Sequence, residues 1–291
     1  MRSFMASERL QVCVESLGAE LCSVKSRHDG LERLWQGDPR SWSRRAPILF
    51  PIVGRLSGDR YLAGGNEYVL AQHGFARDRE FKLIESGPAR LLYRLSSDEE
   101  SLKAYPFQFE LMVRYELDGG RLEVAYGVAN AGSSRMFFSI GAHPGFACPP
   151  HPGERFEEYE LVFEKKETAR RHFLQGGLLT GESAPLLEDE DRFQLSGSLF
   201  ERDALIFKGL RSTWAAMQRK GGGRRLNVHF EGWPYLGIWT KPGAPFLCIE
   251  PWQGLADRAG APGRLEEKEG ILALEPGGLF QRSFFITVDE E

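Results

Sequence analysis

The feature of this chain that most constrains its fold is a two-residue alternation of apolar and polar side chains. From Phe109 to Leu117 the odd positions are apolar, and the even positions are polar except Met112. After an Asp-Gly-Gly turn signal the alternation resumes and runs from Leu122 to Val128. Because successive side chains of a strand point to opposite faces, this segment is predicted to form a hairpin with one buried face.

Short runs of similar character recur along the whole chain, with Gly- and Pro-rich turn signals between them. They cover residues 10–14, 67–70, 80–84, 90–95, 159–163, 214–218, 226–230, 235–240, 246–249 and 284–288. The best helical candidate is short, residues 97–103, with acidic residues where a helix N-terminus favours them. Many short strands joined by hairpin turns favour a sandwich or barrel over βαβ units. Because no linker interrupts the pattern, we predict one all-β domain over residues 1–291, a large antiparallel β-sandwich with few short helices.

Charge and hydropathy exclude several classes of partner. The formal net charge is −4 and the basic residues are dispersed, whereas binding to nucleic acid or anionic membranes requires clustered positive charge. No stretch approaches the roughly 18 apolar residues of a membrane span, and the N-terminus lacks the apolar core of a signal peptide. We therefore expect a cytoplasmic protein, a monomer or homodimer, whose partner is a small molecule.

Motifs for metals and cofactors are missing as well. The four cysteines form neither a CxxC pair nor a zinc-type spacing, which is typical of free, buried thiols in a reduced compartment. No histidine pair has the i,i+4 spacing of a metal site, and no glycine-rich phosphate-binding motif occurs. The sequence predicts neither a metal nor a cofactor.

Two ionisable residues stand beside Gly or Pro at predicted strand ends, where ligand-binding groups tend to lie. Glu250 follows an apolar run and precedes Pro251 and Trp252. Desolvation against the indole would raise the pKa of this carboxyl group and make it a usable base, although a structural salt bridge is the alternative. His143 precedes Pro144, and its ordinary pKa of about 6.5 lets it donate or accept a proton. A loop histidine bonded to the backbone is the alternative there.

Other candidates carry the same kind of ambiguity. His73 lies in a Gly-flanked segment and has the same two interpretations as His143. Arg55 could clamp hydroxyl groups or lie on the surface with its stem packed down. Trp239 could offer a flat face to a sugar ring, but core packing explains a tryptophan in a strand equally well, and we favour it.

Taken in chain order, these segments resemble the aldose 1-epimerase (galactose mutarotase-like) family over most of the chain. The resemblance is carried by Arg55 in Val-Gly-Arg-Leu, the first histidine motif at 72–77 with His73 and Arg77, the second at 141–146 with His143, the strand at 202–207 with Asp203, and the segment that begins at Glu250.

The resemblance implies a β-supersandwich that interconverts the α and β anomers of an aldose. Glu250 would take the proton of the anomeric hydroxyl group while His143 protonates the ring oxygen, and His73, Arg55 and Asp203 would bind hydroxyl groups and stabilise charge. Such chemistry needs no metal or redox carrier. This chemistry does require a base and an acid on opposite sides of C1 and the ring oxygen.

The segment after His143 departs from that of galactose mutarotases, because Gly145, Phe146 and Ala147 follow Pro144. It is similar instead to a divergent branch associated with sugar operons. A phosphorylated aldose would require extra basic residues in the pocket, and Arg77 and Lys241 are the candidates.

Two other functions stay open at this point. One is a non-catalytic carbohydrate-binding or sensing module on the same fold. The other is a glycoside hydrolase or lyase that uses Glu250 with Asp203 as its second carboxylate.

Overall fold

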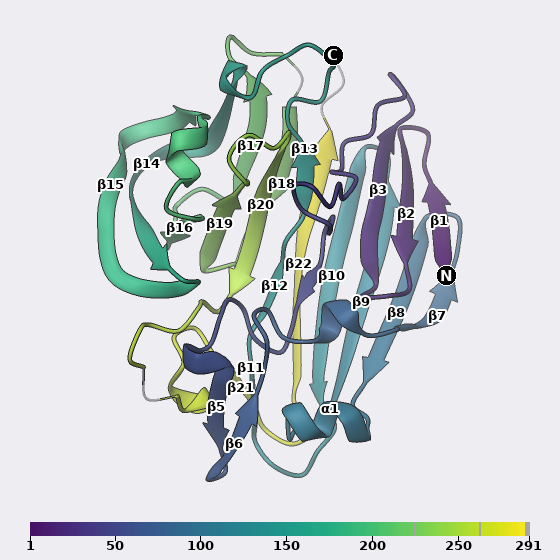
Figure 1. Ribbon diagram of the computed structural model, residues 1–291. Coiled ribbons are helices and arrows are strands. Elements are labelled where there is room, and N and C mark those ends of the chain that lie inside the picture. The colour runs from purple at the N-terminus through teal and green to yellow at the C-terminus, as the bar shows by residue number, and fades with distance from the viewer. Residues whose placement is uncertain (224, 262, 289–291) are drawn as a thin grey trace.

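Antiparallel strands build most of the molecule in the computed structural model, which describes residues 1–223, 225–261 and 263–288 (Figure 1). The main sheet has 15 strands. From one neighbour to the next it runs through β4 (Ile48–Leu49), β12 (Ile140–Ala142), β20 (Phe246–Gln253), β19 (Tyr235–Trp239), β16 (Leu205–Lys208), β14 (Tyr159–Gln175), β17 (Trp214–Arg219), β18 (Arg225–His229), β22 (Leu279–Val288), β10 (Arg121–Asn130), β9 (Phe109–Asp118), β8 (Arg90–Ser96) and β7 (Lys82–Ser86).

The remaining strands attach to this sheet or form small sheets of their own. β13 (Gly145–Ala147) pairs with β20, and β15 (Leu178–Gln194) pairs with β14. The small sheets are β1 (Arg2–Ala6), β2 (Leu10–Glu15) and β3 (Glu20–Ser26); β5 (Arg60–Ala63) and β6 (Asn66–Val69); and β11 (Met136–Phe138) and β21 (Leu272–Leu274). The helices are α1 (Glu99–Ala104) and 3₁₀ turns at Ser57–Asp59, Ala76–Asp78, Phe156–Glu158, Gly197–Phe200 and Leu265–Glu267. The predicted fold class is confirmed.

The hairpin predicted from the alternation is β9–β10, in which Leu117 pairs with Leu122. Along both strands buried side chains alternate with half-buried or exposed ones. The buried face of β8 and β9 packs against the small sheet β1–β3, which lies in front of it in Figure 1. The hydroxyl group of Tyr115 donates to the carbonyl oxygen of Ala19 at 2.7 Å across this interface. The sandwich therefore follows from burial of one face on each of two sheets.

The predicted short helix is α1. Its N-terminus is closed by a reciprocal cap, because the Asp98 carboxylate accepts from the Ser101 backbone N–H at 2.7 Å and the Ser101 hydroxyl accepts from the Asp98 backbone N–H at 2.8 Å. Within the described part of the chain, every helix is too short or too polar to cross a lipid bilayer.

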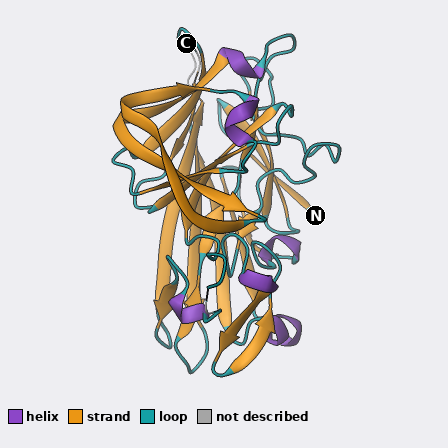
Figure 2. Ribbon diagram, turned by 60° about the vertical axis from the view of Figure 1, so that its left-hand side comes forward, coloured by secondary structure: helices purple, strands orange, loops and turns teal. Residues whose placement is uncertain are grey.

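The β14–β15 ribbon was not predicted at its true length. Both strands have 17 residues, and the pair curves outward from the main sheet (Figures 1 and 2). Several register shifts along the pair explain the curvature, because a bulge bends and twists a strand. The tip of the ribbon returns to the body of the protein, where the Leu179 N–H donates to the carbonyl oxygen of Asp257 at 2.8 Å. This contact places the ribbon tip at the edge of the site described next.

Candidate active site

The fold brings six of the eight predicted site residues to the wall of one cavity of about 340 Å³. The cavity lies beside strands β16, β19 and β20, and the tip of the β14–β15 ribbon forms part of its wall. Its volume is at the small end of the range for ligand pockets, which suits one small molecule better than a polymer chain. The six residues are His73, Arg77, His143, Asp203, Trp239 and Glu250.

The side chain of Glu250 projects from β20 and is almost completely shielded from solvent. Its side chain is only 1% exposed, and neither carboxylate oxygen has a hydrogen-bond partner among the described residues. Burial raises the pKa of Glu250 well above its usual value, and the nearby charge of Asp203 acts in the same direction. On the neighbouring strand Gly237 lies opposite Glu250, and any side chain there would collide with the ring of Trp252.

His143 is held next to Glu250 by strand pairing on both sides of its loop. Gly141 in β12 pairs with Trp252, and Gly145 in β13 pairs with Cys248, so both ends of the loop are fixed to β20 on either side of Glu250. The Nε2 atom of His143 lies 3.2 Å from Oε2 of Glu250. This contact is at ion-pair distance, although the angle is not that of a hydrogen bond.

The arrangement of the pair differs from the expected one. An acid and a base on opposite sides of C1 and the ring oxygen are expected for this chemistry, whereas Glu250 and His143 are neighbours that face the cavity together. The anomeric hydroxyl oxygen and the ring oxygen are both bonded to C1. Adjacent groups can therefore reach both oxygens from one side of the sugar.

The protonation of the pair follows from its burial. Burial, with a smaller contribution from Arg77, lowers the pKa of His143 to about 3, while burial raises that of Glu250. Both shifts disfavour charge, so burial favours the form of the pair in which one proton is carried by Glu250 and the imidazole of His143 is neutral. The ion pair of a carboxylate and an imidazolium contains the same number of protons. Transfer across the 3.2 Å contact interconverts the two forms without exchange with solvent.

His73 is held as a neutral hydrogen-bond donor. Its backbone has φ +68°, a strained conformation for a residue with a side chain and one that clusters at functional sites. Its Nδ1 accepts from the Gly54 N–H at 3.1 Å, which assigns the proton of the neutral ring to Nε2. Burial, followed by the charge on His143, lowers the pKa of His73 well below its usual value. The Nε2 atom lies 3.3 Å from the side-chain amide of Gln72, which lines the same cavity, so a ligand hydroxyl group would accept from Nε2–H in place of that contact.

Asp203, Arg77 and Trp239 line the remaining wall. Asp203 also has a left-handed backbone, with φ +71°, and its Oδ1 accepts from the Ala204 N–H at 2.8 Å. Arg77 donates to the carbonyl oxygen of Gln72 at 2.6 Å, while its buried Nε has no hydrogen-bond partner among the described residues. Burial lowers the pKa of Arg77 to about 10. The ring of Trp239 meets that of His143 edge-on, with centroids 5.7 Å apart.

Two basic candidates lie elsewhere. The guanidinium group of Arg55 forms two hydrogen bonds of 2.8 Å with Asp59 and one of 3.3 Å with the carbonyl oxygen of Gly176, so it supports the ribbon tip and does not line the cavity. Lys241 donates to the carbonyl oxygen of Arg40 at 3.1 Å on the exposed surface. The predicted roles of both residues in sugar binding stay predictions.

Trp42 is a site residue that the sequence analysis missed. Its indole stacks on the imidazole of His143, with centroids 4.9 Å apart and planes at 29°. The loop that carries it is anchored by Trp35, whose Nε1–H donates to the carbonyl oxygen of Trp42 at 2.8 Å. A tryptophan between Ser41 and Ser43, outside any motif, was the only available signal. Stacking on an indole stabilises a protonated imidazole and fixes the plane of its ring.

Replacing Trp42 by leucine is expected to lower kcat for any proton transfer from His143 by about 2- to 30-fold, because the imidazolium loses its cation–π contact. Trp42→Phe, which keeps a weaker stack, should fall between wild type and Trp42→Leu. Trp214→Leu removes a tryptophan that stacks on a different histidine, His229, and serves as the control. A kcat in Trp42→Leu equal to that of wild type would show that the stack does not assist His143.

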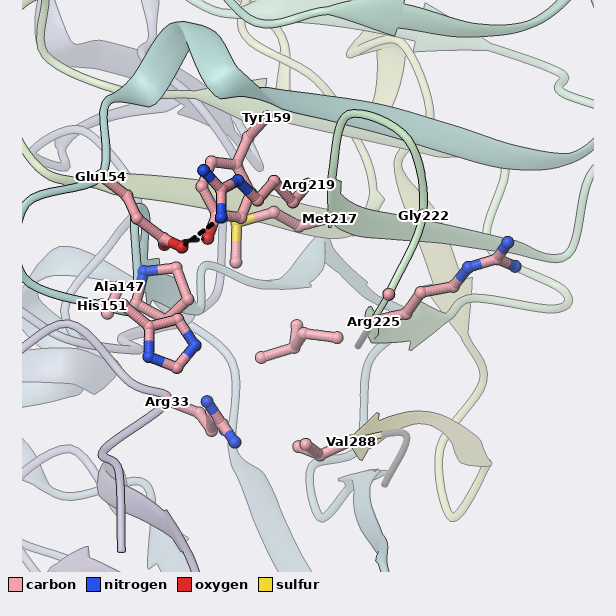
Figure 3. Close-up of a pocket in the computed structure, with 13 residues that line it drawn as sticks. Arg33, Ala147, His151, Glu154, Tyr159, Met217, Arg219, Gly222, Arg225 and Val288 are labelled. Atoms are coloured by element: carbon pink, nitrogen blue, oxygen red, sulfur yellow. Dashed lines mark hydrogen bonds and ion pairs between the residues drawn. The ribbon is translucent and has the colours of Figure 1, made fainter. Parts of the chain in front are cut away.

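A second cavity, of about 270 Å³, lacks such chemistry (Figure 3). Its wall includes apolar side chains such as Met217 and Val288. Its one carboxylate, Glu154, is already bound by the hydroxyl group of Tyr159 and by Arg219, the latter at 3.2 Å. The candidate active site is the cavity that contains Glu250 and His143, because its wall brings together a buried carboxyl group and a buried imidazole.

Comparison with known proteins relates the whole chain to one group of sequences. The model of the aldose 1-epimerase family matches residues 4–268. The plasmid-encoded protein LacX of Lactococcus lactis subsp. lactis is 35% identical over 294 aligned residues, which cover 98% of each chain.

Solved structures agree with this relation. The galactose mutarotase related enzyme of Lactobacillus acidophilus superposes with a TM-score of 0.95 at 37% identity, covering 100% of this chain and 98% of the other. A galactose mutarotase-like protein of Lactobacillus casei superposes with a TM-score of 0.93 at 29% identity, covering 99% of this chain and 100% of the other.

Proposed function

The chain belongs to the aldose 1-epimerase family, and from this premise we propose that it interconverts the α and β anomers of a small aldose, with Glu250 as base and His143 as acid. One observation carries the proposal: a buried carboxyl group and a buried imidazole meet at 3.2 Å on the wall of a cavity of about 340 Å³. A site that only binds a sugar does not require a buried pair of an acid and a base.

Ring opening uses the ion-pair form of the two residues. The Glu250 carboxylate takes the proton of the anomeric hydroxyl group while the His143 imidazolium gives its proton to the ring oxygen. The bond between C1 and the ring oxygen breaks, and the electrons of the former O–H bond form the aldehyde. The pair ends as a neutral carboxylic acid and a neutral imidazole, which is the form that burial favours.

Ring closure uses that neutral form. After the aldehyde end has rotated about its single bond to C2, His143 takes the proton of the attacking hydroxyl group and Glu250 returns a proton to the aldehyde oxygen. The sugar is released as the other anomer, and the pair regains its starting state. In each turnover the pair passes once through the ion-pair form and once through the neutral form. Both forms contain one proton, so no proton has to come from solvent.

We propose that three further residues hold the sugar during the rotation. His73 offers an Nε2–H donor and Asp203 offers a carboxylate as acceptor. Arg77 contributes a buried Nε–H that lies 3.8 Å from the Asp78 carboxylate and has no hydrogen-bond partner among the described residues. We propose that these groups bind the hydroxyl groups of the sugar and that Trp239 packs against its ring. Arg77 would contact a hydroxyl group of a free aldose or the phosphate group of a phosphorylated one.

The pH profile should show the proton balance of the pair. The pair gains a second proton only when His143 is protonated, and the pKa of His143 is lowered to about 3. The pair loses its last proton only when Glu250 ionises, and the pKa of Glu250 is raised well above 4.5. We therefore expect kcat/KM, corrected for the uncatalysed rate at each pH, to have no acid limb centred near 6.5, the usual pKa of histidine. An acid limb centred near pH 6.5 would show that His143 titrates as an independent, solvated group.

The function itself is tested by anomer exchange in NMR magnetisation-transfer spectra across free and phosphorylated aldoses. We expect faster exchange for at least one small aldose, without change in its chemical identity. Tight binding of a sugar with no acceleration would favour the non-catalytic binding module. Release of a sugar from glycosides with activated leaving groups would favour the hydrolase, in which Asp203 is the second carboxylate.

A further inference from the structure

Three donor groups of the kinds that bind Zn²⁺ come together beside the cavity, although their spacing in the sequence predicted no metal site. The imidazole of His143, the thiol of Cys248 and the carboxylate of Glu250 each offer one ligand atom, and these atoms lie within 4.8 Å of one another. Cys248 and Glu250 are two residues apart in β20 and therefore face the same side of the strand. The pairing of Gly145 with Cys248 brings the His143 loop to that side.

We propose that this cluster binds a thiophilic divalent cation of the Zn²⁺ type, and that the bound ion inhibits anomer exchange by occupying the acid–base pair. The inhibitory part rests on the proposed function, whereas binding of the ion does not. The cation has a route to the cluster, because His143 and Glu250 line the cavity that would admit the sugar.

The geometry is close to that of a three-ligand zinc site. Zinc bonds of 2.0 to 2.3 Å in a tetrahedron place the donor atoms about 3.5 Å apart. His143 Nε2 and Glu250 Oε2 are at 3.2 Å, and the widest pair, within 4.8 Å, needs to close by about 1 Å. The fourth position would face the cavity and hold water. Three protein ligands with one open position are typical of zinc sites that are accessible to small molecules.

The charge balance favours a dication at this place. Before binding, the thiol holds one proton and the Glu250–His143 pair holds one, so the cluster is neutral. Binding of Zn²⁺ releases both protons and leaves a thiolate, a carboxylate and a neutral imidazole around the ion, so the cluster is neutral again. Burying a charge is costly unless it is fully compensated, and here two anionic donors compensate the ion. Metal binding should consequently weaken as the pH falls.

Two of the donor groups are deeply buried, and the Glu250 carboxylate lacks hydrogen-bond partners among the described residues. Glu250 is 1% exposed and Cys248 is 0% exposed. The described residues provide no hydrogen-bond partner for either carboxylate oxygen of Glu250. A metal ion would therefore satisfy buried groups without displacing existing hydrogen bonds.

Binding can be measured independently of activity. Metal-free protein is titrated with Zn²⁺ in competition with a chromogenic chelator, and with Co²⁺ to detect the near-ultraviolet charge-transfer band of a cobalt–thiolate bond. We expect one tightly bound equivalent and the thiolate band. Cys248→Ala should weaken Zn²⁺ binding at least about 100-fold, more than the loss of a residue that only supports a ligand, and abolish the band. Cys148→Ala is the matched control, because Cys148 is also a fully buried thiol and is outside the cluster.

Activity gives the second readout. Zn²⁺ should inhibit anomer exchange by wild type and Cys148→Ala, a chelator should restore it, and Cys248→Ala should be as active as wild type without metal but resistant to Zn²⁺. If Cys248→Ala fails to fold, Glu250→Gln must weaken Zn²⁺ binding instead. Equal Zn²⁺ affinity in wild type and Cys248→Ala, or no binding by wild type, would overturn the inference while leaving the proposed function intact. Zn²⁺ binding with the thiolate band but no exchange of any aldose would refute the proposed function and keep the metal site.

Discussion

Replacing Glu250 by glutamine is expected to slow anomer exchange by about 10²- to 10⁴-fold, the usual contribution of a general acid or base. The amide has nearly the shape of the carboxyl group but cannot take the proton of the anomeric hydroxyl group. Sugar binding should survive, because His73, Arg77 and Asp203 are unchanged. The rate is measured by polarimetry on freshly dissolved anomer after subtraction of the uncatalysed rate, and binding is measured by calorimetry.

The stability of Glu250→Gln provides an internal check. Folding raises the pKa of Glu250 above its unfolded value of about 4.5, so the wild type loses stability as the pH rises through 4.5 toward the folded pKa. Glutamine removes this loss, so the variant should be at least as stable as wild type at pH 7 and gain no advantage well below pH 4.5. Glu167→Gln is the matched control, because Glu167 is also buried, at 3% exposure, but its carboxylate binds Ser212. Unchanged exchange in Glu250→Gln would rule out the assigned base.

Replacing His143 by glutamine is expected to cost a similar factor, about 10²- to 10⁴-fold in kcat. The amide can donate a hydrogen bond to the ring oxygen but cannot transfer a proton to it. Because binding of the sugar depends on other residues, KM should change much less than kcat, as expected for an interaction made in the transition state. Stopped-flow polarimetry over a range of sugar concentrations separates the two constants.

The acid stability of this variant is predicted as well. Folding lowers the pKa of His143 from 6.5 to about 3, so its contribution to wild-type stability is complete above pH 6.5 and is lost as the pH falls toward 3. Thermal unfolding of His143→Gln should therefore be less sensitive to acid over that range. His28→Gln, at an exposed position outside the cavity, controls for the loss of a histidine. A variant that loses affinity for the sugar but keeps kcat would identify His143 as a binding residue only.

The parts of the fold that the sequence predicted are those in which one face of a strand is buried. β9 and β10 show the alternation because one side packs into the core, and α1 was found from its acidic first turn. The β14–β15 ribbon was not predicted at its full length because it leaves the core and carries exposed charged side chains in succession, such as Glu164, Lys165 and Lys166. Without a buried face there is no periodicity to detect.

The site could be predicted residue by residue but not as an arrangement. Gly and Pro beside Glu250 and His143 marked both residues, whereas their contact depends on the pairing of β12 and β13 with β20, strands too short to leave a signal. Arg55 lies outside the cavity wall, where Asp59, four residues later, accepts from Nε and one terminal nitrogen of its guanidinium group. Trp42 lies in no motif, so its stacking on His143 was visible only in three dimensions.

The central claim is that Glu250 and His143 act together on the two oxygens of one hemiacetal carbon. It is tested most directly by a crystal structure of Glu250→Gln in complex with the aldose that shows the fastest exchange. The account predicts the sugar in the cavity with the anomeric hydroxyl group within hydrogen-bond distance of the residue 250 side chain and the ring oxygen within hydrogen-bond distance of His143 Nε2. A sugar bound with C1 directed away from both residues, or bound outside this cavity, would contradict it.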